Sequence, residues 1–137
     1  MDVLQPVATH LADIYPHVGV GERPTAVPDG MAWATVWNTD ARPPVDANDI
    51  DRYDVALSTI VQIKTIGWSW RQVADVGRLL DARIRDGLTI DGRAVHLVIR
   101  ERASGPTRDE ARHPEPGVFL YDQWYRIDHA PDLADAS

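Results

Sequence analysis

The sequence contains five histidines, the side chains that most often act as general bases and metal ligands near neutral pH. No two of them stand at the spacing with which one helix holds a metal ion, and the segment 113–115 (His-Pro-Glu) has no second cluster to complete a ligand set. We therefore expect structural or incidental roles for all five, and no metal site. They are His10, His17, His96, His113 and His129.

Candidates for a nucleophile are few. The chain has no cysteine, which excludes disulfide bonds, thiolate metal sites and a cysteine nucleophile, so a reducing compartment suffices. Of its few serines, Ser69 is predicted to cap a helix. A Ser–His–acid arrangement stays open, because such residues meet in space rather than along the chain. No local motif supports one.

Two short patterns resemble ligand sites but lack essential parts. Gly19-Val20-Gly21 could begin a dinucleotide-binding fingerprint, yet Pro24 occupies the third glycine position and no helix is predicted to open there. An acidic cluster has spacings that could suit Ca²⁺, but it lacks the turn glycine and the distal glutamate of a calcium loop, so a solvated loop is the favoured interpretation. Its members are Asp46, Asp49, Asp51 and Asp54.

Composition and charge narrow the function classes. The 137 residues fit one domain, predicted to span 1–137, and 44% hydrophobic residues are typical of a globular protein. Fourteen basic against 21 acidic residues give a net charge of −7, which argues against a domain that binds nucleic acid by neutralising phosphates. The apolar runs are far too short for a membrane span. The N-terminal residues show no basic-then-apolar signal layout.

The first half of the chain alternates between regular elements and polar connections. Residues 2–15 form a predicted helix, with Pro6 in its first turn, where the missing N–H is tolerated. A short extended piece at Val18–Val20 leads into an irregular loop. A strand with an aromatic face follows at 33–37, then a polar connection over 38–52, then a long strand from Tyr53 with period-two alternation.

The strongest local signal is a helix that begins after Ser69. Ser69 and Gln72 have the spacing of a capping box, and Trp68 and Val73 have that of a hydrophobic staple. The helix ends at Gly87. Gly77 interrupts its apolar stripe, which reflects either close approach of the helix to a sheet or a position where glycine has no structural purpose.

The second half predicts a hairpin and two strands. Asp91-Gly92 marks the hairpin turn, and Val95, Leu97 and Ile99 are expected on the inward face of the next strand. Residues 103–116 are predicted to be a long exposed loop, 118–129 the last strand and 131–137 a flexible tail. The predicted fold class is α+β: a mostly antiparallel sheet of four to five strands, with two helices on one face and long loops.

Five tryptophans are many for a chain of this size. Trp33 and Trp37 are expected in the core. Trp68 and Trp70 bracket a helix start, and one of them can anchor a partner surface. Trp124 faces away from the apolar side of its strand, so it either packs under a helix or contacts another subunit. The predicted interface residues are Trp68, Trp70, Trp124, Arg108, Asp109, Glu110 and Arg112.

Taken together, the order and texture of these elements resemble the tail terminator, or tail completion, proteins of long-tailed bacteriophages, in particular those of actinobacteria. The dominance of arginine over lysine fits a GC-rich host. The resemblance covers nearly the whole chain and rests on the segments "YPHVGVGERP", "AWATVWNT", "YDVALSTIVQIKTIG", "SWRQVADVGRLLDARIRDG", "VHLVIRERASGPTRDE" and "PGVFLYDQWYRI".

The resemblance implies a structural role. Proteins of this family form a hexameric ring that caps the tail tube, ends its polymerisation and joins it to the head connector, while DNA passes through without specific binding. It implies the virion neck as location, with the host cytoplasm during assembly, no enzymatic activity, no cofactor and no membrane partner. Partners would be further copies, the major tail tube protein and the connector or stopper protein.

Charge suggests where the parts of such a ring would lie. Six copies would carry about −42 in total, and like charge along a channel keeps DNA from adhering to its wall. We expect Asp46, Asp49, Asp51 and Asp54 to line the lumen and the 103–116 loop to reach a neighbouring ring or connector.

Other classes remain as alternatives. One is another head–tail connector protein, a stopper or adaptor. A second is a small acidic immunity-like or antitoxin-like protein that neutralises a basic partner, with strong salt dependence. A third is a small ligand-binding or hydrolytic enzyme with a polar cavity and perturbed ionisable groups.

Overall fold

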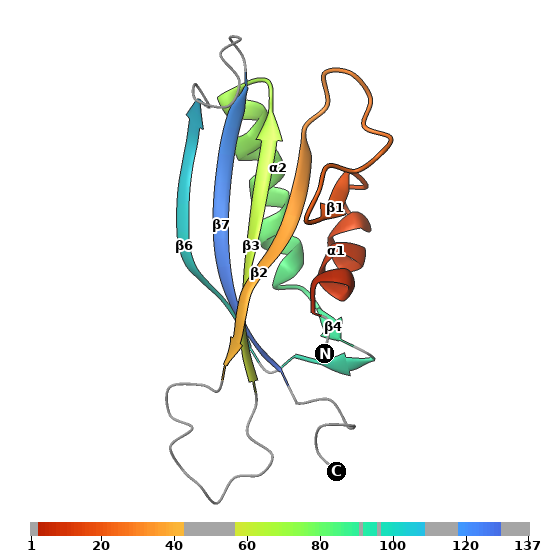
Figure 1. Ribbon diagram of the computed structural model, residues 1–137, viewed down its shortest axis with the longest axis vertical. Coiled ribbons are helices and arrows are strands. Elements are labelled where there is room, and N and C mark those ends of the chain that lie inside the picture. Colours follow the sequence, from red (N-terminus) through yellow and green to blue (C-terminus); the bar gives the residue numbers. More distant parts are fainter. Residues whose placement is uncertain (1–2, 43–56, 91, 96, 109–117, 130–137) are drawn as a thin grey trace, which may run out of the picture.

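A five-stranded sheet forms the body of the protein. The computed structural model describes residues 3–42, 57–90, 92–95, 97–108 and 118–129, and every structural statement below concerns these residues. The spatial strand order is β1-β2-β3-β7-β6, in which only the β1–β2 pair is parallel (Figure 1). The strands are β1 (Val18–Val20), β2 (Trp33–Arg42), β3 (Leu57–Gly67), β6 (Leu97–Arg108) and β7 (Phe119–His129).

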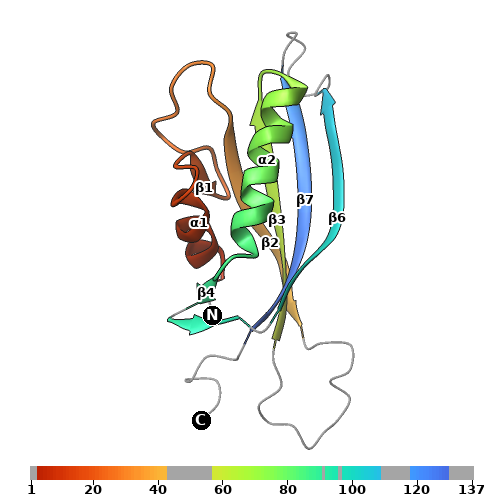
Figure 2. The ribbon, with the colours of Figure 1, turned by 180° about the vertical axis from the view of Figure 1, so that it is seen from behind.

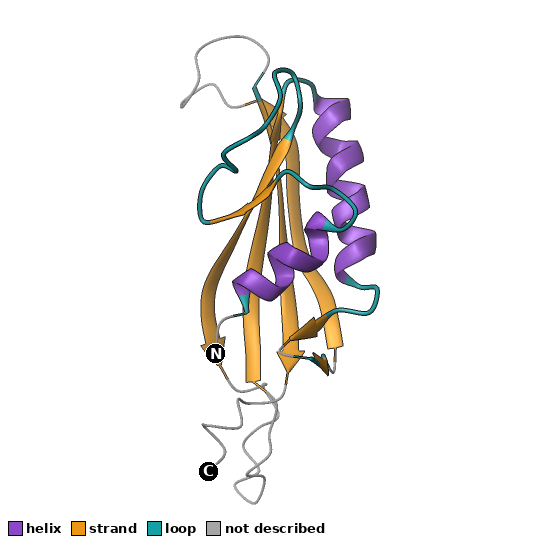
Figure 3. Cartoon of the chain, turned by 90° about the vertical axis from the view of Figure 1, so that its right-hand side faces the viewer, coloured by secondary structure: helices purple, strands orange, loops and turns teal. Residues whose placement is uncertain are grey.

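Two helices cover the same face of this sheet. Helix α1 (Leu4–Ala12) lies beside β1 and β2, and helix α2 (Trp70–Ile84) crosses β3, β7 and β6 (Figures 2 and 3). A two-stranded hairpin, β4 (Thr89–Ile90) and β5 (Arg93–Ala94), joins α2 to β6. The predicted α+β class, the helix positions and the hairpin are therefore confirmed.

The core lies between the helices and the sheet. Alternate residues of β3 and β7 point inward, as period-two strands require, and meet the apolar stripe of α2. The largest fully buried apolar side chains are Leu11, Ile63, Leu80, Ile84, Tyr125 and Ile127.

The start of α2 forms as predicted, with one change of partner. The Ser69 hydroxyl accepts a hydrogen bond from the Gln72 N–H at 3.1 Å. The Gln72 side chain reaches past Ser69 and accepts from the Trp68 N–H at 2.8 Å, while its amide donates to the Gly30 carbonyl at 2.8 Å. The cap thus fastens the helix start to the loop before β2.

Two glycines allow α2 to lie close to the sheet. A Cβ on Gly77 would lie 3.2 Å from Gln123 Nε2 and 3.3 Å from Tyr121 Cδ1, which confirms the predicted close approach. A Cβ on Gly67 would lie 2.8 Å from Val73 Cγ1, so Gly67 is the residue that meets Val73 at the helix start. The predicted staple partner, Trp68, instead lies edge-on to another ring.

Several predicted boundaries were wrong. Helix α1 ends at Ala12 rather than Tyr15, so Ile14 lies beyond the helix and is half exposed. Strand β2 continues to Arg42, into the stretch predicted as a loop. Residues 103–108 are also strand and not loop, because they pair with β7 beyond a bulge, as far as Arg108 opposite Phe119.

The facing of two strands also differs from the prediction. On β6, Val98 packs against the core, whereas Leu97 and Ile99 are exposed, because Val98 lies opposite the buried Ile127. On β2, the small residues Ala34 and Val36 take the core face. Trp37, expected in the core, is 43% exposed on the opposite face.

Candidate interaction surface

The face of the sheet opposite the helices is left uncovered by the described elements (Figure 1). We call it the open face. The strand register places side chains from four strands in one row across its middle: Trp37 of β2, Gln62 of β3, Trp124 of β7 and Arg102 of β6. Trp124 therefore does not pack under a helix, which eliminates one of its two predicted environments.

Both tryptophans of this row are held by neighbouring polar groups. The Arg102 guanidinium lies 3.9 Å from the centre of the Trp124 ring, in cation–π geometry. The Trp37 indole N–H donates to the Thr35 hydroxyl at 2.9 Å. Aromatic groups fixed in this way lose little conformational entropy when they meet a partner.

A second group of aromatic side chains gathers at one end of the sheet, and we call it the aromatic corner. Trp33 and Trp68 meet edge to face with ring centres 6.4 Å apart, and Arg23 covers Trp33 at 4.2 Å. Trp70, in the first turn of α2, is 58% exposed, and Arg71 lies 5.8 Å from its ring. Large exposed aromatic residues of this kind are typical anchors of protein interfaces.

The sheet separates the predicted site residues into groups. At the end of the sheet that carries Trp68, Phe119 pairs with both Gly67 and Arg108. The connection 109–117 is therefore attached to the sheet at the aromatic corner. Trp124 lies farther along the open face. Asp109, Glu110 and Arg112 lie outside the described residues.

The connection that carries the predicted lumen carboxylates is attached at the other end of the sheet. Arg42 and Ser58 pair there, so the connection between β2 and β3 is attached at that end. With about 3.3 Å per strand residue, the two ends are about 33 Å apart. Asp46, Asp49, Asp51 and Asp54 themselves lie outside the described residues.

A polar cluster that the sequence did not predict lies between α2 and the sheet. The Tyr125 hydroxyl lies 2.7 Å from Asp81 Oδ1 and 2.9 Å from Gln123 Oε1. Arg85 donates to Asp81 at 2.7 Å, and Arg100 donates to Gln123 at 3.2 Å. The Gln123 amide donates to a helix carbonyl, that of Gly77, at 3.0 Å.

Electrostatics and geometry show that this cluster is structural. Burial raises the pKa of Tyr125 far above its usual value, and the hydrogen bond to Asp81 raises it further. A base or nucleophile at neutral pH needs a pKa shifted toward 7 and access to a substrate. Tyr125 has neither, since its side chain is fully buried and its hydroxyl is held between two acceptors.

The described histidines contact groups of the protein itself. His10 Nε2 lies 2.7 Å from the Arg83 carbonyl and links α1 to α2, while His129 Nε2 lies 2.8 Å from the Thr59 hydroxyl inside the core. Over the described ranges, no three His, Cys, Asp or Glu side chains gather as a metal site would require. Neither described helix is long and apolar enough to span a membrane.

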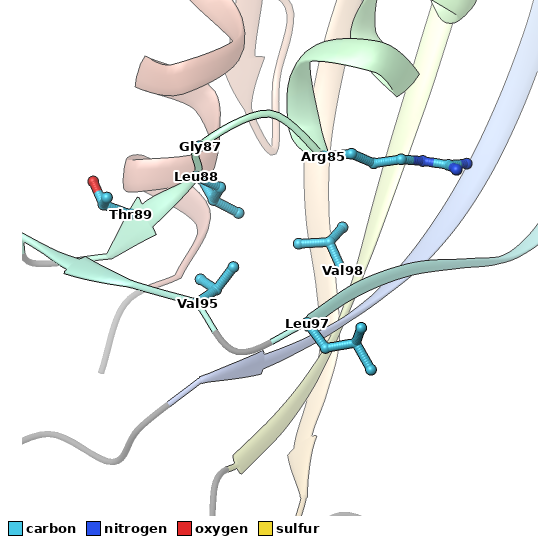
Figure 4. Close-up of a pocket in the computed structure, with 7 residues that line it drawn as sticks. All are labelled: Arg85, Gly87, Leu88, Thr89, Val95, Leu97 and Val98. Carbon is cyan, nitrogen blue, oxygen red and sulfur yellow. The ribbon is translucent and has the colours of Figure 1, made fainter.

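A groove of about 510 Å³ opens where α2 ends and β6 begins (Figure 4). Its walls are mostly aliphatic, which favours an apolar side chain over a polar substrate. Arg85 supplies a cation at its edge. The lining residues are Arg85, Gly87, Leu88, Thr89, Val95, Leu97 and Val98.

Of the comparisons with known proteins, the one with solved structures gives a match. No protein-family model and no curated protein matches the chain. Among solved structures, the fold is similar to that of a chain in the virion of a native gene transfer agent particle, with a TM-score of 0.66 and 12% sequence identity. The likeness covers 94% of this chain and 95% of that chain, so the two share a fold over nearly their whole length.

Proposed function

We propose that this chain is a structural virion protein of a long-tailed phage or phage-like particle. In this role it forms a hexameric ring that caps the tail tube, ends tube polymerisation and joins the tail to the head connector. The observation that carries the proposal is the end-to-end similarity in fold to a chain of a gene transfer agent virion. The sequence resemblance to tail terminator proteins supplies the specific role.

The surfaces of the molecule support an assembling protein. A cyclic ring needs two different patches on each copy, one for each neighbour. The open face, with Trp37 and Trp124, and the aromatic corner, with Trp68 and Trp70, are distinct patches that expose large aromatic residues. A groove with mostly aliphatic walls opens at the end of the sheet opposite the aromatic corner, where α2 ends and β6 begins.

The attachment points of the connections support a protein with two axial neighbours. The 109–117 connection starts at the aromatic corner, and the acidic 43–56 connection starts at the opposite end. We propose that the first contacts the connector or the tube and that the second brings Asp46, Asp49, Asp51 and Asp54 toward the lumen. A net basic lumen in a reconstructed ring would contradict the second part.

Mass distinguishes the proposal from its rivals. Six copies of 15.3 kDa give a ring of about 92 kDa, whereas an immunity-like protein would be a monomer or dimer. Native mass spectrometry should detect the hexamer, alone or after addition of purified tail tubes. A monomer that never joins tubes, or one that turns over a substrate, would refute the proposal. Localisation to the connector away from the tube would favour a stopper.

The 109–117 connection can be tested without disturbing the sheet. A deletion over 105–115 would remove paired residues of β6, so the loop test must begin after Arg108. We expect replacement of 110–115 by a short Gly-Ser link to leave the melting temperature nearly unchanged and to abolish docking to the head. Unchanged docking would show that this connection is not the contact.

A further inference from the structure

Strand β6 is the last strand of the described sheet, and only its beginning is suited to bind another strand. Its register shifts between Arg100 and Arg102 and again between Ser104 and Thr107, and Pro106 has no N–H to donate. Bulges, charges and proline are the features that keep a sheet edge from pairing with other chains. Residues 97–100 contain no bulge and no proline and pair with β7 in regular register, and Arg100, which lies 3.8 Å from Asp81, is the one charged residue among them.

This beginning of β6 carries apolar side chains on both faces. Leu97 and Ile99 are 43% and 38% exposed on the open face, and Val98 faces the helix side. The 510 Å³ groove lies directly beside Leu97 and Val98 (Figure 4). A regular strand edge next to a pocket is the arrangement with which proteins bind an extended peptide: main-chain hydrogen bonds supply affinity and the pocket selects a side chain.

Charge indicates what kind of peptide fits. Arg85 and Arg100 lie 2.7 and 3.8 Å from the same carboxylate, Asp81, so two cations share one anion. These three side chains together carry one excess positive charge, and Arg85 is the one at the edge of the apolar groove. The matching segment has an apolar side chain next to carboxylates and no basic residue.

The chain itself contains such a segment. Residues 131–136 read Pro-Asp-Leu-Ala-Asp-Ala, with Leu133 between Asp132 and Asp135. They follow β7, whose Asp128 lies opposite Leu97, so the segment starts from the end of the molecule that carries the groove. In a head-to-tail ring, the segment of one copy is offered to the groove of the next.

We propose that the groove and residues 97–100 of β6 bind residues 131–136 of a second copy as an added strand, with Leu133 in the groove. This inference rests on the proposed function, because only an assembly of several copies brings a second copy to this site. It assigns one subunit contact of the ring to a described surface.

Self-association of the purified full chain tests it by sedimentation equilibrium from micromolar to near-millimolar concentration. We expect Leu97→Asp, and separately removal of residues 131–137, to weaken association at least about tenfold, as loss of an interface anchor does. The matched control is Leu79→Asp on α2, because Leu79 is 46% exposed and Leu97 43%, but Leu79 lies outside the groove. The control should associate within about twofold of the unmodified chain.

A competing peptide and a milder substitution distinguish loss of this contact from loss of folding. A synthetic peptide of residues 131–137 should compete with association of the unmodified chain and have no effect on the Leu97→Asp variant. If Leu97→Asp misfolds by circular dichroism, Leu97→Ala replaces it, with the same expected direction.

Different outcomes would contradict this inference and the proposed function. An unmodified chain that stays monomeric throughout, or Leu97→Asp and the truncated chain associating like the control, would overturn the inference. A ring found at the tail end with the β6 groove empty would also overturn it and leave the proposed function intact. Absence of the chain from particles would remove the proposed function itself.

Discussion

Replacement of Tyr125 by phenylalanine tests the buried polar cluster that fixes α2 to the sheet. The Tyr125 side chain is fully buried, and its hydroxyl lies 2.7 Å from Asp81 Oδ1. The variant keeps the ring and its packing and removes only the hydroxyl. Asp81 retains Arg85 at 2.7 Å, so one donor to the carboxylate survives.

The expected loss follows from this geometry. A hydrogen bond to a charged acceptor contributes about 1.5–3 kcal/mol. The Asp81 side chain is 22% exposed, so water partly replaces the lost donor. We therefore expect the lower end of the range, about 1.5 kcal/mol, which for a domain of this size lowers the melting temperature by about 5 °C.

Thermal and urea denaturation, followed by circular dichroism, measure the difference. The matched control is Tyr121→Phe, since Tyr121 lies on the same face of β7 and its hydroxyl has no hydrogen-bond partner among the described residues. The control should differ from the unmodified chain by less than about 0.5 kcal/mol. Equal losses in both variants would show that the Tyr125–Asp81 bond does not stabilise the fold.

The same pair of variants predicts a pH dependence. The pKa of Tyr125 is raised in the folded state, so its stabilising contribution is complete below pH 10, the unfolded pKa, and is lost as pH rises further. At pH 11 the unfolded state gains about 1.4 kcal/mol from ionisation that the folded state does not share. The advantage of the unmodified chain over Tyr125→Phe should therefore nearly vanish by pH 11. A constant difference from pH 8 to pH 11 would refute the argument.

Three further changes test other contacts. Ser69→Ala removes the cap of α2 and should cost about 1 kcal/mol in chemical denaturation, with Ser104→Ala, on exposed β6, as the neutral control. Gly67→Ala places a Cβ 2.7 Å from Gln72 Oε1 and 2.8 Å from Val73 Cγ1, so it should cost about 2 kcal/mol; an unchanged melting temperature would contradict this packing. Arg102→Ala should shift the fluorescence of Trp124 while changing stability by less than about 1 kcal/mol, whereas Arg78→Ala should leave the spectrum unchanged.

The elements that local chemistry determines could be predicted from the sequence. Helix α2 combines an N-cap serine, an apolar stripe and a terminal glycine within one continuous segment. The cap and the stripe form as predicted, whereas the helix ends at Ile84, before Gly87, which has a positive φ. The β4–β5 hairpin was predicted from its Asp-Gly turn, and the pairing of Thr89 with Ala94 confirms it. Such signals need no knowledge of distant residues.

Elements that depend on tertiary pairing were less predictable. Residues 103–108 look like a loop, because Gly105 and Pro106 interrupt them, yet hydrogen bonding to β7 holds them as strand. Residues 95–100 carry apolar side chains at odd and even positions, so the pattern could not decide which face is buried. The facing of Trp37 was wrong because α1 packs over the small residues of β2, which leaves the large ones outside.

The polar cluster and the groove join distant parts of the chain. Tyr125 and Asp81 are 44 residues apart, and the groove needs α2, the hairpin and β6 together. One clue to the cluster was present: Gln123 is polar on the otherwise apolar face of the last strand. A buried amide needs partners, and here they are the Gly77 carbonyl and Arg100.

Cryo-electron microscopy of tailed particles isolated from the cells that produce this chain tests the proposed function most directly. The account predicts six copies of the five-stranded, two-helix fold in a ring between the tail tube and the head connector. A fully traced junction made only of other proteins, with this chain absent from the particle, would contradict it.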